Sequence, residues 1–244
     1  MVQSSGRSKN RLLFNLSNKN AIVSGGSSGI GGEISISLLE SGCKVFIFSR
    51  DINKLNSFKK KLPKNLKSNL FFTPYDACNN SNFDHLQKHI STVFRKTDIL
   101  INNVGGGGRW GSKEFELTER KVWSEVFSKN IEISYLLTMS TIKGMISNNW
   151  GRVINISSIF GKEYGGRPWF NISKAAQISL NKNLSHYDKA TKKNITFNTI
   201  SPGAILTKDA GWEKLKTSNK NKYKKFLNQI PRGKIGNPLD VANL

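Results

Sequence analysis

The 244-residue sequence has two cysteines, 16 acidic residues and no long hydrophobic run. Cys43 precedes one predicted strand and Cys78 follows the next, which places them at opposite ends of a parallel sheet, roughly 15 Å apart at about 3.3 Å per strand residue. A disulfide needs Cα atoms within about 7 Å of each other, so both thiols are expected to be reduced, as in a cytoplasm. No stretch is apolar for long enough to predict a signal peptide or a membrane span, and no membrane partner is expected.

Acidic residues are outnumbered by 38 lysines and arginines, which gives a formal net charge of +22 and an isoelectric point near 10.1. Such a balance suits nucleic acid, a membrane surface or an anionic substrate. The lysines are scattered, however, in groups at 59–67, 192–193 and 214–225. No run alternates basic with aromatic residues as in a groove for single-stranded nucleic acid. The pattern favours solvated faces in a lysine-rich and asparagine-rich chain, with a functional polyanion surface as the alternative, and predicts no nucleic-acid partner.

Short apolar runs alternate with amphipathic segments after a polar N-terminal arm at residues 1–12. The runs predict strands at 21–24, 44–48, 69–73, 99–102, 153–157 and 195–200. The segments between them predict helices that include 31–41, 83–96, 121–147 and 175–191. This alternation predicts an α/β fold with one doubly wound parallel sheet and helices on both faces.

One domain is predicted over residues 13–244. Residues 208–234 interrupt the alternation, because they are polar and lysine-rich and carry Trp212, and they are predicted to form a mobile substrate lid. Asn237 directly before Pro238 favours the start of a last helix, with asparagine as the cap and proline in the first turn.

Glycines cluster where the first predicted strand meets the first predicted helix, in Ser24-Gly25-Gly26-Ser27-Ser28-Gly29-Ile30-Gly31. Glycine lets the backbone turn sharply, approach a pyrophosphate and pack the helix on the strand. The helix N-terminus offers free N–H groups and the positive end of its dipole to the phosphates. The run lacks the Lys-Ser/Thr pair of a P-loop, so it disfavours an ATPase and favours nucleotide binding of the dinucleotide type.

The second predicted strand leads into Ser49 and Arg50, where an NAD-binding chain usually carries an acidic residue for the ribose 2′-hydroxyl. A guanidinium there would pair with a 2′-phosphate, so NADP(H) is favoured as the cofactor. Asp51 follows directly, which leaves NAD(H), or the use of both cofactors, open. An ordinary solvated role for Arg50 is the other alternative.

Six motifs in order resemble those of the short-chain dehydrogenase/reductase family. Residues 24–31 are similar to its Thr-Gly-x-x-x-Gly-Ile-Gly turn, residues 102–105 (Asn-Asn-Val-Gly) to its Asn-Asn-Ala-Gly motif, and residues 201–207 to its Pro-Gly-x-x-x-Thr nicotinamide loop. The resemblance implies a Rossmann-type fold that binds NAD(P), with no metal. It also implies cofactor contacts at Ser24, Gly25, Ser27, Ser28, Gly29, Ile30, Gly31, Ser49, Arg50, Asp76, Asn103, Gly105, Lys174, Pro202, Gly203, Ile205 and Thr207.

The same resemblance implies a catalytic set of Asn130, Ser158 and Lys174, together with residue 170. Two departures stand out. Phe170 occupies the place of the tyrosine in the family's Tyr-x-x-x-Lys motif, and the family's final helix and seventh strand are missing. In the family the tyrosine hydroxyl moves a proton to or from the substrate oxygen during hydride transfer, the serine hydrogen-bonds that oxygen, and the asparagine helps to hold a water chain to the lysine. Phenylalanine has no proton to offer.

Three outcomes therefore stay open for the proton. Ser158 or a water bound to Lys174 carries it, Tyr164 of the preceding loop reaches in, or the protein binds its cofactor without turnover. The leading interpretation is an NADP(H)-dependent oxidoreductase acting on a carbonyl/hydroxyl pair. A catalytically impaired NADP(H)-binding relative with a binding or regulatory role is the alternative, and a basic nucleic-acid binder is a weaker one.

The predicted loops at the carboxyl ends of the strands carry arginine and tryptophan at 105–110, 167–169 and 212. These side chains suit an anionic group beside a flat or sugar-like surface, so a small anionic or sugar-like carbonyl or alcohol is the expected substrate. The sixth strand is expected to form an apolar edge, which predicts a homo-oligomer or poor solubility.

Overall fold

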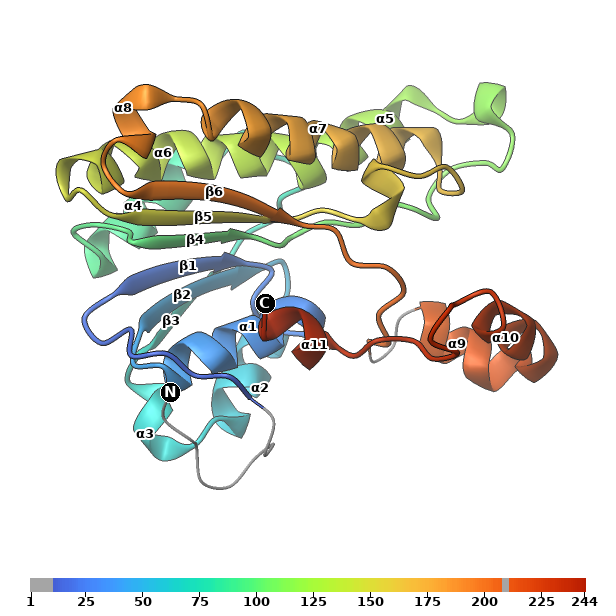
Figure 1. The fold of residues 1–244 in the computed structure, drawn as a ribbon, viewed down its shortest axis with the longest axis horizontal. Coiled ribbons are helices and arrows are strands. Elements are labelled where there is room, and N and C mark those ends of the chain that lie inside the picture. The colour runs from blue at the N-terminus through green and yellow to red at the C-terminus, as the bar shows by residue number, and fades with distance from the viewer. Residues whose placement is uncertain (1–10, 208–210) are drawn as a thin grey trace.

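A six-stranded sheet lies between two layers of helices in the computed structural model, which describes residues 11–207 and 211–244 (Figure 1). Its strands are β1 (Asn20–Ser24), β2 (Lys44–Ser49), β3 (Leu70–Pro74), β4 (Ile99–Asn102), β5 (Gly151–Ile156) and β6 (Ile195–Ile200). They pair in parallel in the order β3-β2-β1-β4-β5-β6. The predicted doubly wound α/β fold is confirmed. The order reverses between β1 and β4, and ligands of such sheets bind beyond the carboxyl ends of the strands at that point.

Successive residues of the central strands point to opposite faces of the sheet, as a side-chain period of two requires. On one face Ile22, Phe46 and Leu100 are buried in a core together with residues of the helices between positions 83 and 191. On the other face Val23 and Ile47 belong to a second core. Burial on both faces explains why these strands appear in the sequence as nearly unbroken apolar runs.

Helices cover the two faces in two groups (Figure 1). One face carries α1 (Gly29–Glu40), α2 (Ile52–Lys61), α3 (Lys64–Lys67) and the short α11 (Pro238–Ala242). The other carries α4 (Phe83–Val93), α5 (Arg120–Phe127), α6 (Ile133–Ser147), α7 (Pro168–Leu184) and α8 (Asp188–Thr191). Among the residues described, no helix is long and apolar enough to cross a membrane.

Two predicted helices differ from the structure. The expected helix 175–191 begins instead at Pro168, because proline fits the first helical turn, and it ends at Leu184 before the separate α8. The expected helix 121–147 contains a π-helical stretch, Ser128–Glu132, between α5 and α6. The earlier start of α7 matters most, since it places Phe170 and Lys174 in one helix.

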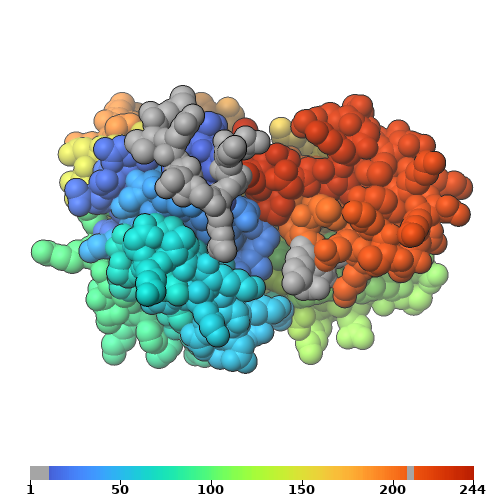
Figure 2. Space-filling view, turned by 90° about the horizontal axis from the view of Figure 1, so that it is seen from below, coloured from blue at the N-terminus to red at the C-terminus, as the bar shows by residue number. Residues whose placement is uncertain are grey.

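The polar segment after β6 forms two further helices, α9 (Gly211–Ser218) and α10 (Lys220–Leu227), beyond the carboxyl edge of the sheet (Figure 1). In space-filling view they stand as an orange-red lobe beside the body of the protein (Figure 2). Trp212 stacks on Phe226 with ring centroids 3.8 Å apart, which joins the two helices. The predicted last helix is present as α11, where Asn237 and Asp240 form a reciprocal capping box.

Both cysteines are free thiols, as predicted, and Cys43 is fully buried. Burial, with the nearby Asp98, raises the pKa of the Cys43 thiol to about 12. Most of the predicted polar arm at 1–12 lies outside the described residues.

Arg11 ties the start of the described chain to α1. Its side chain is 5% exposed and forms ion pairs with Glu33 and, at 3.0 Å, with Glu40. It also donates to the Ser37 hydroxyl. Burial raises the pKa of Glu40 and the arginine lowers it, so the guanidinium is what makes a charged Glu40 acceptable there.

Arg11→Met is expected to lower the free energy of unfolding by about 2 kcal/mol at neutral pH, because it leaves two carboxylates without their partner. Without the guanidinium the pKa of Glu40 rises further above its unfolded value. The stability loss should therefore be largest above that raised pKa and shrink as the pH falls through it. Urea denaturation at pH 7 and pH 5 measures both effects, with the exposed Arg95→Met as control. An equal loss at the two pH values would assign the effect to packing alone.

Candidate functional site

The turn between β1 and α1 needs glycine at three positions. Gly25 and Gly29 have φ of +66° and +55°, in the left-handed region that favours glycine. Gly31 is helical, but a Cβ there would collide with the carbonyl oxygen of Gly25 and the side-chain nitrogen of Asn103. The turn therefore lies directly against β4 with no room for a side chain.

Ser24 and Asn103 fasten this turn to the end of β4. The Ser24 hydroxyl oxygen accepts from the backbone N–H groups of Asn103 and Val104, at 2.9 Å each. The Asn103 side-chain nitrogen donates to the carbonyl oxygen of Ser24 at 2.9 Å and to that of Gly25 at 3.3 Å. The structure thus uses both side chains to shape the predicted cofactor site.

The N-terminus of α1 is open toward this cleft. Its cap residue Ser28 makes no side-chain capping hydrogen bond, so the first N–H groups of the helix are left for a ligand. The methyl group of Thr207 lies 3.2 Å from where a Cβ of Gly29 would be, which brings the predicted nicotinamide loop to the same turn. Within that loop, the carbonyl oxygen of Pro202 accepts from Ile159 N, and Ile205 bridges to Gly236.

A cavity of about 250 Å³ opens beside the turn. The predicted cofactor residues that line it are Gly25, Ser28, Ser49, Arg50, Asp76, Asn103 and Gly105. Arg50 and Asp76 face each other at 3.9 Å (Nε to Oδ1), and both side chains are more than half exposed. Of the remaining predicted contacts, Ser27 and Gly29 line a second groove beside α1, to which Ser28 also contributes. Ile30 packs against the core under α1.

Sequence reasoning missed Lys129, which also lines this cavity. Its ammonium group lies 4.8 Å from the ring centroid of Trp110, and burial lowers its pKa. In the sequence, the only signal for Lys129 was its position directly before Asn130, a predicted catalytic residue.

Phe170 and Lys174 lie one turn apart on α7, with Nζ of Lys174 5.8 Å from the centroid of the Phe170 ring. A Cβ on Gly105 would lie 2.8 Å from Oδ1 of Asn130 and 2.9 Å from Nζ of Lys174, so Asn130 and Lys174 meet behind this glycine. A Cβ on Gly108 would lie 3.2 Å from the Phe170 ring, so the aromatic side chain packs along the same glycine loop.

Asn130 lies in the π-helical stretch between α5 and α6. Its side-chain nitrogen donates to the carbonyl oxygens of Val126 (2.7 Å) and Gly106 (2.9 Å), and its side-chain oxygen accepts from Gly106 N at 3.1 Å. The irregular stretch thus turns the asparagine onto the glycine loop, as π-bulges often do at functional sites. The Ser158 hydroxyl oxygen accepts a hydrogen bond from Phe160 N at 3.2 Å and so caps the short 3-10 helix Ile159–Gly161, which follows β5.

Lys174 is buried, with 4% of its surface exposed. Its Nζ donates to the carbonyl oxygen of Ile156 and to Oε1 of Gln177, at 2.9 Å each. Burial, reinforced by the charge of Lys129, lowers the pKa of Lys174 to about 7. Gln177 was not predicted from the sequence, although a glutamine one turn after the lysine on the same helix face was visible there.

Two other sequence expectations are corrected. Tyr164 is 94% exposed, so its hydroxyl lies in solvent and does not take the place of the missing tyrosine. Trp169 is fully buried and donates to the carbonyl oxygen of Gly107 at 3.3 Å, which makes it a structural support of the glycine loop instead of a substrate surface. Arg109, with its guanidinium carbon 5.4 Å from the Trp212 ring centroid, does connect this loop to α9.

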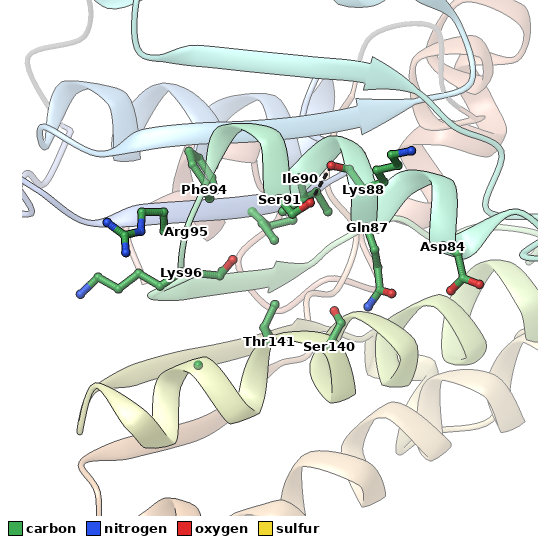
Figure 3. Close-up of a pocket in the computed structure, with 13 residues that line it drawn as sticks. Asp84, Gln87, Lys88, Ile90, Ser91, Phe94, Arg95, Lys96, Ser140 and Thr141 are labelled. Atoms are coloured by element: carbon green, nitrogen blue, oxygen red, sulfur yellow. Dashed lines mark hydrogen bonds between the residues drawn. The ribbon is translucent and has the colours of Figure 1, made fainter.

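A larger cavity of about 540 Å³ lies between α4 and α6 (Figure 3). Its lining includes Lys88, Arg95 and Thr141, and none of the residues predicted for cofactor or catalysis. The candidate site is therefore the smaller cavity at the glycine turn.

Comparison with known proteins identifies the family of this chain. The model of the short chain dehydrogenase family matches residues 19–216. The 3-oxoacyl-[acyl-carrier-protein] reductase FabG of Rickettsia conorii is 32% identical over 237 residues, which cover 95% of this chain and 89% of that protein.

Two solved structures share the fold with a TM-score of 0.80 each. L-sorbose reductase from Gluconobacter frateurii, complexed with NADPH and L-sorbose, is 25% identical, with 94% of this chain and 89% of that chain covered. A variant of ElxO with phenylalanine in place of a tyrosine and NADPH bound is 26% identical, with 92% and 88% covered. The chain belongs to the short-chain dehydrogenase/reductase family and is an NAD(P)-dependent oxidoreductase of that family.

Proposed function

We propose that this protein binds NADP(H) at the glycine turn and interconverts a ketone and an alcohol on a small substrate that carries an anionic or sugar-like group. The observation that supports this most directly is the cradle of Gly25, Gly29 and Gly31 under an uncapped helix N-terminus. A pyrophosphate fits there because backbone N–H groups and the helix dipole meet it where no side chain intervenes. Two of the similar proteins, a 3-oxoacyl reductase and a sorbose reductase, are named for substrates that contain a ketone.

Different residues around the cavity would bind different parts of the cofactor. Arg50 would hold the 2′-phosphate, Asp76 the adenine ring, and residues 202–207 the nicotinamide end. The bound cofactor supplies or accepts a hydride at the substrate carbon. Ser158 would hydrogen-bond the substrate oxygen, with Asn130 shaping the loop behind it. The α9–α10 segment, with Arg109 against Trp212, would close over the substrate as a lid.

A second candidate function is cofactor binding with little turnover. It is favoured by the benzene ring of Phe170, which fills the proton donor's place without a hydroxyl. The two functions separate in one experiment: NADPH titration by fluorescence, then NADPH oxidation with a panel of ketones. Tight binding with no oxidation above background would favour the second candidate, and no binding would reject both.

Gly31→Ala should abolish measurable NADPH binding, because the added methyl group collides with the Gly25 carbonyl and displaces the turn. Gly32→Ala is the matched control. A Cβ there meets its nearest atom at 3.5 Å, an ordinary contact, and alanine should stabilise the helix by about 0.5–1 kcal/mol. NADPH fluorescence and thermal melts of both variants test this pair. Equal binding by the two would place the pyrophosphate elsewhere.

Arg50→Met should weaken NADPH binding by about tenfold to a hundredfold and leave NADH binding nearly unchanged, since a charge-assisted bond to the 2′-phosphate is worth about 1.5–3 kcal/mol. The ratio of the two dissociation constants is the measurement. If both constants move together, or neither moves, Arg50 is a solvated residue with no part in cofactor choice.

Phe170→Tyr should raise the NADPH-dependent turnover rate of a ketone by about 10²–10⁴, the usual contribution of a general acid. The new hydroxyl would lie one helical turn from the Lys174 ammonium, and this positive charge would favour the ionised form of the tyrosine. Steady-state kinetics beside the wild type and a Phe170→Leu control decide the matter. A rate unchanged by the tyrosine would mean that proton transfer does not limit turnover.

A further inference from the structure

Lys129 belongs to the π-helical stretch Ser128–Glu132 and lines the cavity beside the glycine turn. Its side chain is half-buried, and its Nζ lies 4.8 Å from the centroid of the Trp110 ring. A Cβ on Gly106 would lie 3.4 Å from the same Nζ. Gly106 directly follows Gly105, which also lines the cavity. The ammonium group therefore lies against the chain that leaves β4, at the cavity wall formed by that chain.

The ammonium group of Lys129 has no carboxylate within ion-pair distance in the part of the chain that the structure describes. Burial lowers the pKa of Lys129, and the carboxylates of Asp76 and Glu125 raise it from farther away. Each of the two faces another cation. Asp76 lies 3.9 Å from Arg50 (Oδ1 to Nε). Glu125 lies 3.9 Å from Lys121 (Oε1 to Nζ). Lys129 is thus a partly desolvated cation whose nearby carboxylates are directed elsewhere.

An aromatic ring holds this cation in place of a carboxylate. The face of a tryptophan ring attracts an ammonium group through its quadrupole but carries no net charge, so the charge of the lysine stays available to a ligand. A carboxylate in the same position would neutralise the lysine and repel an incoming anion. Trp110 is itself fixed in the glycine loop, where its backbone N–H donates to the carbonyl oxygen of Gly107 at 3.1 Å. The cavity therefore presents a positioned positive charge, which suits an anionic ligand.

The order of the strands indicates which part of a dinucleotide Lys129 would meet. The order β2-β1-β4 places the glycine turn, which follows β1, between the ends of β2 and β4. Arg50 follows β2 on one side of the turn, and Gly105 with Lys129 lies on the β4 side. A dinucleotide with its 2′-phosphate at Arg50 and its pyrophosphate at the start of α1 would therefore reach Lys129 with the pyrophosphate and the riboses beside it. The 2′-phosphate would stay on the other side of the turn.

We propose that Lys129 binds the diphosphate that NADP(H) and NAD(H) share, so that it supplies affinity for either cofactor, whereas Arg50 supplies the preference for NADP(H). This proposal rests on the proposed function. It gives each of the two cations that line the cavity its own phosphate group. The positive charges of Arg50 and Lys129 repel each other, and a dinucleotide bound between them would relieve this repulsion.

Lys129→Gln removes the charge and keeps a polar side chain. It should weaken the binding of NADPH and of NADH by the same factor, about tenfold, which is the size of one charge-assisted contact. The ratio of the two dissociation constants should therefore stay at its wild-type value. Lys129→Arg keeps the charge and should keep most of the affinity. Lys143→Gln, at an exposed position of α6, is the matched control and should change neither constant. Isothermal titration calorimetry measures these constants without turnover.

Fragments of the cofactor locate the contact. ADP-ribose carries the diphosphate without a 2′-phosphate, and adenosine 2′-monophosphate carries the 2′-phosphate without the diphosphate. Lys129→Gln should weaken ADP-ribose binding by about tenfold and leave adenosine 2′-monophosphate binding unchanged. Arg50→Met should have the opposite effect on the two fragments. Thermal melts show whether each variant folds, and Lys129→Met takes the place of Lys129→Gln if that variant does not.

The proposal is overturned if the uncharged variant of Lys129 binds both dinucleotides and ADP-ribose as tightly as the wild type. It is also overturned if that variant loses affinity for NADPH and adenosine 2′-monophosphate alone, because Lys129 would then bind the 2′-phosphate. Both results leave the proposed function intact, since the wild type still binds its cofactor. A wild type that binds neither dinucleotide rejects the proposed function itself, and this contact with it.

Discussion

The junction between the carboxyl ends of β1 and β4 is the constraint on which the rest of the site depends. Ser24 accepts two backbone N–H groups of the chain leaving β4, and Asn103 returns a hydrogen bond to the carbonyl oxygen of Ser24. This exchange draws the two segments so close that Gly31 cannot carry a side chain. The N-terminus of α1, whose cap residue Ser28 makes no side-chain capping hydrogen bond, and Gly105 of the chain leaving β4 line the same cavity. The shape of the proposed cofactor site therefore follows from the hydrogen bonds between the segments that leave β1 and β4.

The catalytic half of the site is built on a different principle. The proposed cofactor half presents backbone and open space, whereas the proposed catalytic half is filled by buried polar groups. Asn130, Gln177 and Ser134 form hydrogen bonds with one another and with the glycine loop, and all three are at most 1% exposed. Phe170 adds an aromatic ring against Gly108. With phenylalanine at position 170 the site is still well packed, and two lysines, Lys129 and Lys174, lie against the glycine loop.

The sequence predicted the strands and the glycine turn well because both signals are local. All six strands lie within two residues of their predicted bounds, since runs such as Val45 to Phe48 are apolar for burial on two faces. The bounds and the regularity of the helices were harder to predict. The start of α7 at Pro168 and the π-helical stretch around Asn130 depend on packing against the glycine loop. Gln177 and Lys129 were missed for a related reason. Gln177 contacts Asn130 and Ser134, 47 and 43 positions away, and Lys129 contacts Trp110, 129 − 110 = 19 positions away. A single sequence does not show which polar side chains the fold will bury.

The strongly basic composition and the behaviour of Lys174 are separate matters, and distance explains why. Most lysines of α2, α9 and α10 are exposed, and salt screens charges beyond about 10 Å at 0.1 M ionic strength. Their summed field therefore acts on approaching anions far more than on a buried amine. Lys129 is different, because it lines the same cavity and is itself partly desolvated. An anionic cofactor bound between Arg50 and Lys129 would neutralise part of that nearby charge. Cofactor binding and the proton affinity of Lys174 are then linked, because the bound anion favours the ammonium form.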